Sequence, residues 1–334
     1  NGRGKIIPGS ERVSVEAKAG TSIRLTIDRD IQWVAQNAIN QAVSSARAQS
    51  GTVIVMDPKT GAILAQASAP TFDPNKASSI TLDKLRNPAV QDVYEPGSTG
   101  KVITVAAAME EGLITPESVF TIPYKMKVAD EYFHDHEKHP TQRLTTTGLL
   151  AVSSNTGSIQ IGQKLGKDRL YEYLRKFGMG QSTNSKLPGE SAGSLLQVKD
   201  WSGTSLPTFA FGQGYSLTAM QTTSVFATIA NNGVRVSPSI LAGVVDENGK
   251  YTQAKENPSV RVLSEQTSQN MRAMMESVVS QNGTAPTAAI PGYRIAGKTG
   301  TANRYNTVCG CYSGYTASFV GFAPADAPEF VVSV

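Results

Sequence analysis

The hydrophobic positions near the start of the chain recur with the period of a helix. Between residues 31 and 46 they fall three and four residues apart, as on one face of an amphipathic helix. The apolar positions of this run are Ile31, Val34, Ala35, Ala38, Ile39, Ala42, Val43 and Ala46. Residues 22–27 form a short strand-like run before it, and Asp28 is a suitable helix cap. The pattern therefore predicts a strand followed by a long helix.

Strand-like runs occur both early and late in the chain. The runs 51–56 and 62–67 are separated by Asp57 to Gly61, a sequence typical of a hairpin turn. Residues 70–93 are irregular. The later strand-like runs are 240–245 and 251–252, joined by the turn 246–249, and then 293–298, 315–322 and 329–334. Ser264 is predicted to cap a helix that runs to about residue 279.

The middle of the chain, from residue 102 to about 235, is predicted to be mainly helical. The candidate helices are 102–111, 156–165, 168–177 and 217–231. A glycine falls at or just past the end of each, as C-terminal caps do; these are Gly112, Gly166, Gly178 and Gly233.

The order of these segments predicts an α/β (α+β) fold. Early and late strands would pair in one antiparallel sheet with helices on both faces, and a helical block would lie beside it. The predicted sheet subdomain covers about 21–95 and 236–334, and the helical subdomain covers about 96–235. The crevice between the two is the expected place for a site.

Composition narrows the class of protein. The 334 residues are 40% hydrophobic and 17% charged, which is ordinary for a globular protein. The net charge of +4 comes without a basic run or an aromatic-basic stripe, so we predict no nucleic-acid partner. No apolar run approaches the ~18 residues that cross a bilayer. Because Asn1-Gly2 is no natural start, we expect a soluble portion of a longer protein, with 1–20 as the exit segment of a preceding domain.

The strongest chemical signal begins at Ser98. Pro96 and Gly97 form a turn directly before a helix-forming run, so Ser98 lies at a helix N-terminus. Lys101 follows about one turn later and can share a face with Ser98. A serine hydroxyl needs a base to become a nucleophile, and a lysine with a depressed pKa can supply one. Alone, this pair also fits a capping serine and a solvated lysine.

Two further motifs favour the catalytic interpretation. Ser153-Ser154-Asn155 has the Ser-x-Asn form, and Lys298-Thr299-Gly300-Thr301 contains Lys-Thr-Gly. Together with Ser-x-x-Lys, and in this order, these motifs are the signature of penicillin-binding proteins and serine β-lactamases.

The chain resembles the transpeptidase domain of class B penicillin-binding proteins, and most closely the septal, cell-division type of actinobacteria. The resemblance runs from about Val53 to Val334 and rests on the strings VMDPKTGAILAQAS, NPAVQDVYEPGSTGK, TTTGLLAVSSNTG, RKFGMG, LPGES, GQGYSLTAMQ, IANNGV, PGYRIAGKTGTA and CGCY. It implies the penicillin-recognising serine transferase fold and cross-linking of peptidoglycan stem peptides through an acyl-enzyme, without a cofactor. It also implies acylation by β-lactams and a membrane-anchored, extracytoplasmic protein at the division septum. Its anchor and pedestal would be missing here, and division-complex membrane proteins would be partners.

The resemblance assigns the first catalytic roles. Ser98 would attack the carbonyl of the penultimate D-Ala and expel the terminal D-Ala. Lys101 would be the base, and Ser153 would relay the proton to the leaving nitrogen, with helix capping as the alternative role. Asn155 would hold the substrate amide and Lys101. Ser154 is expected to be structural.

The Lys298 motif would bind the substrate along an edge strand. Lys298 would keep Lys101 neutral by repulsion and attract the substrate carboxylate. Thr299 and Thr301 would donate hydroxyls to that carboxylate, and Gly300 would let the substrate lie against the strand. The N–H groups of Ser98 and Thr301 would form the oxyanion hole, each contributing roughly 3 kcal/mol.

Two other clusters carry weaker signals. His134, His136 and His139 lie among acidic residues, but strand spacing separates His139 from the other two. We therefore predict no metal site there and favour a polar lip of the cleft or a partner contact. Cys309 and Cys311 are the only cysteines, and we predict a disulfide between them, with two free thiols as the alternative.

Two other functions compete with transpeptidation. A serine β-lactamase or β-lactam sensor would share the acylation machinery. A class A lactamase uses a deacylating glutamate in a Glu-x-x-Leu-Asn loop, and no such string occurs; Glu190 is the nearest acid in that part of the chain. A non-catalytic division scaffold is the other alternative, and it would not need Ser98, Lys101 and Lys298 together.

Overall fold

The computed structural model describes residues 18, 20–76, 80–306 and 309–334. The predicted exit segment, 1–20, lies almost wholly outside the described residues, so its role stays a prediction. In the described part of the chain, no helix has both the length and the apolarity to cross a membrane.

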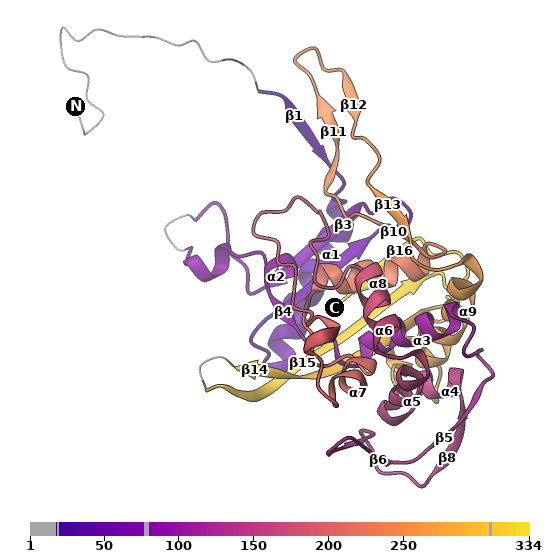
Figure 1. Cartoon of the computed structure of the whole chain (residues 1–334). Coiled ribbons are helices and arrows are strands. Elements are labelled where there is room, and N and C mark those ends of the chain that lie inside the picture. Colours follow the sequence, from indigo (N-terminus) through magenta and orange to yellow (C-terminus); the bar gives the residue numbers. More distant parts are fainter. Residues whose placement is uncertain (1–17, 19, 77–79, 307–308) are drawn as a thin grey trace, which may run out of the picture.

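A five-stranded antiparallel sheet forms the centre of the molecule (Figure 1). It joins strands from both ends of the sequence, as predicted. From one edge to the other its strands are β14 (Ala296–Asn306), β15 (Cys311–Ala323), β16 (Phe330–Ser333), β2 (Gly51–Met56) and β3 (Ile63–Ala69). β14 is therefore an edge strand of this sheet.

One face of the sheet is covered by helix α1 (Arg29–Ala46), the predicted amphipathic helix. Asp28 caps it by accepting hydrogen bonds from the N–H groups of Asp30 and Ile31. Ala35 and Ile39 are buried against β2 and β3, on the stripe that the helical period marked. The residues of β2 alternate between this small cluster and the main core, so the strand is buried on both faces.

Three helices build the main core on the opposite face. They are α3 (Lys101–Glu110), α8 (Ala219–Ala230) and α9 (Glu265–Val279). α8 packs on β15, β16 and β2, and α9 packs on β14. Ser264 caps α9 as predicted, and α8 begins with a capping box of Thr218 and Gln221. Nine of the ten residues of α3 are buried, and the 3-10 helix directly before it, η3 (Gly97–Gly100), packs on β14.

The remaining helices are short or lie outside this layer. The α-helices are α2 (Pro88–Gln91), α4 (Thr146–Ala151), α5 (Asn155–Leu165), α6 (Lys167–Lys176) and α7 (Ser205–Ala210). The 3-10 helices are η2 (Leu82–Leu85), η3 (Gly97–Gly100), η4 (Val198–Asp200) and η5 (Pro286–Ala288). The predicted helices of the middle block thus occur, with ends shifted by one or two residues.

The structure corrects the sequence reading of strands in two places. The block predicted as mainly helical also contains two hairpin-like pairs, which Figure 1 shows beside α5. They are β5 (Val119–Ile122) with β8 (Gln142–Thr145), and β6 (Lys125–Val128) with β7 (Glu131–His134). Each strand has only four residues, too few for a two-residue period to stand out.

The early strand β1 (Ser22–Leu25) also pairs outside the central sheet. It joins β11 (Leu241–Val245) and β12 (Tyr251–Gln253) in a separate three-stranded sheet. Two further pairs complete the fold, β4 (Val93–Tyr94) with β9 (Leu217–Thr218) and β10 (Val234–Val236) with β13 (Ser259–Arg261). The predicted subdomain boundaries remain a prediction.

Candidate active site

Ser98 lies in a tight turn between the short strand β4 and helix α3. The turn is the 3-10 helix η3, which runs directly into α3, so Ser98 faces a helix N-terminus as predicted. Gly97 has a φ of +54°, a conformation that favours glycine. Ser98 itself is half-buried and lines a cleft. Its side chain is therefore reachable from the cleft.

The turn is joined to a second loop, 212–215. The N–H of Gly97 donates to the carbonyl of Gly212 at 2.8 Å. The N–H of Gly214 donates to the carboxylate of Glu95 at 3.0 Å. A Cβ on Gly212 would lie 1.8 Å from the carbonyl oxygen of Gly97. The backbone that carries Ser98 is thus packed on a loop that only a glycine can form.

Lys101 is completely buried and points at the Ser153 segment. Its Nζ donates to the backbone carbonyl of Ser153 and lies 3.2 Å from Ser153 Oγ. Burial lowers the pKa of Lys101 well below its usual range, and the charge of Lys298 lowers it further, while Asp135 raises it. The expected repulsion by Lys298 is confirmed, although burial is the larger cause.

Ser153 links the two buried lysines. Its Oγ accepts a hydrogen bond from Lys298 Nζ at 2.9 Å and is also within reach of Lys101 Nζ. Ser153 has a φ of +60°, which is uncommon for a residue with a side chain. The alternative capping role is wrong for Ser153, because Ser154 is the cap of α5 and accepts from the N–H of Gly157. The structural role predicted for Ser154 is confirmed.

Asn155 differs from its expected role. Its Nδ2 donates to the carbonyl of His134 at 2.9 Å, whereas the hydrogen bonds of Lys101 go to Ser153. Asn155 therefore does not hold Lys101. It still lines the cleft, so a contact with a substrate amide remains a prediction.

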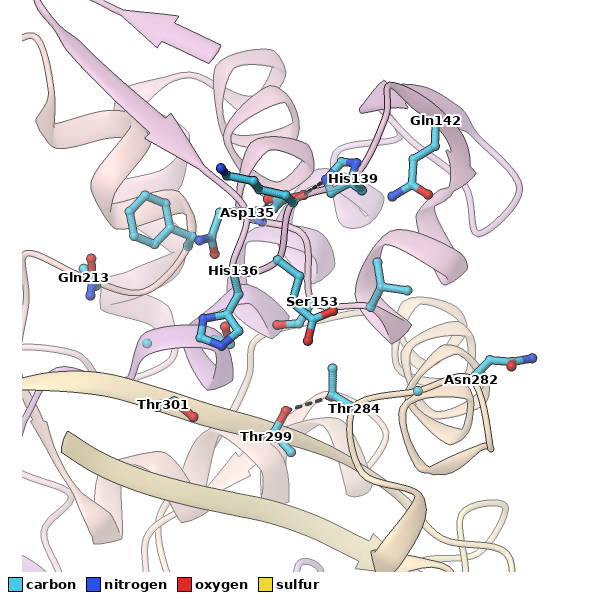
Figure 2. A pocket seen from close by; sticks show the side chains of 18 residues that line it. Asp135, His136, His139, Gln142, Ser153, Gln213, Asn282, Thr284, Thr299 and Thr301 are labelled. Carbon is cyan, nitrogen blue, oxygen red and sulfur yellow. Dashed lines mark hydrogen bonds and ion pairs between the residues drawn. The ribbon is translucent and has the colours of Figure 1, made fainter. Parts of the chain in front are cut away.

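Strand β14 places Lys298 and the two threonines as expected. Lys298 is buried, and burial lowers its pKa to about 7. Thr299 and Thr301 are two residues apart and both line the cleft, as one face of a strand requires. Figure 2 shows Thr299 bonded to Thr284, with 2.8 Å between the two hydroxyl oxygens.

The structure explains why residue 300 is a glycine. A Cβ there would lie 2.9 Å from the carbonyl oxygen of Pro96 and 3.0 Å from Thr99. β14 and the serine turn thus approach so closely that only glycine fits between them. Whether Gly300 also eases substrate docking remains a prediction.

These side chains surround a cleft of about 700 Å³. Ser98, Ser153 and Asn155 lie in it together with Thr299 and Thr301. In Figure 2, Asp135, His136 and His139 lie on the side of the cleft opposite β14. The three motifs, which lie between residues 98 and 301 of the sequence, therefore meet in one open site.

The histidine segment forms part of this cleft. His134 ends β7, and residues 135–139 contribute one lip, as the sequence suggested. Within the described residues, no group of three or more His, Cys, Asp or Glu side chains is arranged to hold a metal ion. His139 instead bonds Asp135, with 3.1 Å between Nε2 and Oδ2.

Cys309 and Cys311 form a disulfide, with Cα atoms 5.2 Å apart. The predicted bond is confirmed, and the alternative of two free thiols is wrong. It closes the connection from β14 to β15, of which residues 307–308 lie outside the described part.

Sequence reasoning missed several residues that shape the site. Asp135 was counted only among the acidic residues around the three histidines, and Gly212 had no assigned role. Thr284, which bonds Thr299, had no role either. The glycines of the 212–214 stretch were a usable signal, because closely spaced glycines often mark a close approach of two backbones.

Comparisons with known proteins agree with this site. The model of the penicillin binding protein transpeptidase domain matches residues 51–334. The chain is 41% identical over 340 residues to the penicillin-binding protein PbpB of Mycolicibacterium smegmatis, covering 99% of this chain and 52% of that protein. It is 35% identical over 325 residues to the peptidoglycan D,D-transpeptidase FtsI of Escherichia coli, covering 96% of this chain and 52% of that protein. The chain thus spans about half the length of the curated relatives it matches.

A solved structure of a penicillin binding protein has a similar fold. The fold matches penicillin binding protein 3 of Mycobacterium tuberculosis in complex with aztreonam, with a TM-score of 0.92 and 41% identity. The match covers 96% of this chain and 74% of that one. The mixed α/β fold predicted from the sequence is therefore shared with a protein that binds a β-lactam.

Proposed function

Because the chain belongs to the penicillin binding protein transpeptidase family, we propose that it is a serine D,D-transpeptidase acting on peptidoglycan stem peptides. The reaction would proceed through an acyl-enzyme at Ser98. β-Lactams would acylate the same serine. The observation that carries this proposal is that Ser153, which contacts both buried lysines Lys101 and Lys298, lines the same open cleft as Ser98.

In the first step, Ser98 Oγ attacks the carbonyl carbon of the penultimate D-Ala. Lys101 accepts the serine proton, and the depressed pKa of its amine supports that role. Ser153 passes a proton to the leaving nitrogen, and its position between two amines suits a relay. The C–N bond breaks, the terminal D-Ala leaves, and an acceptor amine then displaces Ser98.

The substrate would lie along β14. Lys298 supplies positive charge beside Ser153, and the hydroxyls of Thr299 and Thr301 serve the substrate carboxylate from the wall of the cleft. The N–H groups of Ser98 and Thr301 act as the oxyanion hole, each contributing roughly 3 kcal/mol to the transition state. No cofactor takes part in this chemistry.

We propose septal cell-wall synthesis on the outer face of the cell membrane as the cellular role. Similarity to the proteins named penicillin-binding protein PbpB and peptidoglycan D,D-transpeptidase FtsI supports this proposal. We also propose division-complex membrane proteins as partners and a membrane anchor outside this chain.

The fate of the acyl-enzyme separates this function from a β-lactamase. The carboxylate of Glu190 accepts hydrogen bonds from Thr183, Ser182 and Ser185, and Glu190 does not line the cleft. It is therefore not placed to activate a deacylating water. This arrangement favours transpeptidation over the lactamase alternative.

Intact-mass spectrometry after mixing with benzylpenicillin tests the proposal. We expect one mass equivalent per chain, mapped by peptide sequencing to Ser98, and slow loss once free drug is removed. A non-covalent scaffold would give no adduct. Rapid turnover of many equivalents would instead support the lactamase reading, and an adduct on another residue would overturn the site.

The Thr301→Val substitution tests carboxylate recognition. Valine keeps the backbone N–H and the shape but removes the hydroxyl, leaving one carboxylate oxygen without a partner. A hydrogen bond to a charged group contributes roughly 1.5 to 3 kcal/mol. The second-order acylation rate should therefore fall by about ten- to a hundredfold.

A ligand with an esterified carboxylate is the control for Thr301→Val, because it never makes this bond. Its rate should change much less on substitution. Equal losses for acid and ester would show that Thr301 does not contact the carboxylate, and docking along β14 would then be wrong.

A further inference from the structure

The buried carboxylate of Asp135 is the most heavily hydrogen-bonded side chain near the cleft. Only 6% of the residue is exposed. Its Oδ1 accepts from the N–H groups of Asn155 at 2.6 Å and Thr156 at 2.8 Å. Its Oδ2 accepts from the hydroxyl of Ser154 at 2.7 Å and from His139 Nε2 at 3.1 Å. The carboxylate therefore ties together two segments distant in sequence.

Three of these donors belong to the first turn of α5 and its cap. The first N–H groups of a helix have no partner within the helix, so a carboxylate there satisfies them and interacts well with the helix dipole. Ser153, which links Lys101 to Lys298, directly precedes this turn in a conformation uncommon for serine. By holding the first turn of α5, the carboxylate therefore also keeps Ser153 in place between Lys101 and Lys298.

His139 faces an acceptor with each ring nitrogen. Nδ1 lies 2.8 Å from the carbonyl oxygen of Pro140, and Nε2 lies 3.1 Å from Asp135 Oδ2. A carbonyl and a carboxylate only accept, so the two ring nitrogens can both donate hydrogen bonds here only in the imidazolium form, which this arrangement therefore favours. The hydrogen bond to Pro140, followed by the contacts with Asp135, raises the pKa of His139.

We propose that Asp135 and His139 form a positioning pair for the transpeptidase site, in which Asp135 clamps the first turn of α5 and imidazolium His139 holds the carboxylate in place. The pair acts on the reaction through the position of Ser153 and through its charge near Lys101, and it rests on the function proposed above. Neither residue is assigned a bond to the reacting atoms.

Several charged and titratable groups surround the pair. Lys101 of α3 is coupled to Asp135, whose charge raises the pKa of that lysine. The ring of Tyr124 lies edge-on to His139 with centroids 6.0 Å apart, and also contacts His134. Glu137 and Lys138 belong to the same loop and line the cleft. Lys101 is the group through which the charge of the pair should reach the chemistry.

This coupling predicts opposite effects for the two members of the pair. Removing the negative charge with Asp135→Asn should lower the pKa of Lys101. Removing the positive charge with His139→Gln should raise it, while glutamine can still donate to Asp135. Because acylation needs neutral Lys101, the acid limb of the pH profile should move to lower pH in the first variant and to higher pH in the second.

The experiment measures the second-order rate of benzylpenicillin acylation from pH 4 to 10. For Asp135→Asn we expect a loss of about ten- to a hundredfold at pH 7, as for a misplaced catalytic group. We expect the acid limb of the pH profile of this variant to move to lower pH by about half a unit or more. Asp130→Asn, an exposed carboxylate in the β6–β7 turn, is the matched control and should leave the profile unchanged. The proposal would be overturned if the acid limb stays in place in Asp135→Asn and His139→Gln, or if it moves in the same direction in both variants.

Nitrogen NMR of the histidine rings gives a second readout that does not depend on acylation. The chain has three histidines, so three ring systems need to be assigned. His139 should keep both ring nitrogens protonated to a higher pH in the unmodified protein than in Asp135→Asn, because Pro140 and Asp135 raise its pKa. A His139 ring whose pKa is not raised above the ordinary histidine value would overturn the proposal even if Asp135→Asn failed to fold. Absence of acylation in the unmodified protein would instead refute the proposed function and leave the NMR result to decide the pair.

Discussion

Replacing Lys101 with methionine is expected to slow acylation by about a thousandfold or more. Methionine fills a similar volume but has no amine to accept the proton of Ser98. General base catalysis typically contributes 10²- to about 10⁴-fold to the rate. Because the amine of Lys101 is buried and its pKa is lowered, we expect a contribution at the high end of this range. Methionine also avoids burying a charge, so the variant should fold. The measurement is the second-order rate constant with a fluorescent penicillin.

Lys164→Met is the matched control for Lys101→Met, because Lys164 is an exposed lysine near the end of α5. Its rate should stay within a factor of two. A loss of less than tenfold in Lys101→Met, with the fold intact, would show that another group takes the proton. Lys298 cannot accept that proton while it is itself charged.

The pKa of Lys298 is about 7, so this lysine loses its charge as the pH rises through 7. Binding of the substrate carboxylate should therefore weaken as the pH rises through 7.

Replacing Gly212 with alanine should damage the site without touching any of its catalytic groups. The new Cβ would lie 1.8 Å from the carbonyl oxygen of Gly97, and Gly212 has a φ of +92°. Because the clashing atom is backbone, the loop or the serine turn must move. A displacement of about 1 Å at a nucleophile can cost roughly a hundredfold in rate. We also expect a stability loss of about 3 kcal/mol or more.

Gly112→Ala separates the clash from backbone strain. Gly112 also has a positive φ, +68°, but no atom lies within 4 Å of the added Cβ. It should lose about 1 kcal/mol of stability, from strain alone, and keep its acylation rate. Thermal melts and acylation rates of both variants make the comparison. Similar results for the two glycines would mean that the close approach of Gly212 and Gly97 does not support the site.

The elements that the sequence predicted well are those specified by nearby residues. The stripe of α1 and its cap at Asp28 lie within one stretch, as do the cap of α9 at Ser264 and the hairpin of β2 and β3. Ser98 and Lys101 are only three residues apart, so a single turn of helix determines how they lie. Local periodicity and capping therefore suffice for these features.

The strands that were missed depend on partners elsewhere in the chain. β5 has no strong pattern of its own and is stabilised by β8, whose first residue lies twenty positions after the end of β5. β1 was expected in the central sheet, but it pairs with β11 in a separate sheet. Four-residue strands gain their hydrogen bonds only once the tertiary structure brings a partner alongside.

The sequence by itself determined the chemistry of this protein: a serine, three residues later a lysine, and two further motifs whose side chains suit acyl transfer. The tertiary structure decided how these groups act on one another. Burial, rather than only the neighbouring charge, lowers the pKa of Lys101, and Ser153 rather than Asn155 holds its amine. Likewise the carboxylate of Asp135 accepts hydrogen bonds from the first turn of α5 and from its cap. Burial, hydrogen-bond partners and close backbone approach are set by residues far apart in the chain, and no local pattern encodes them.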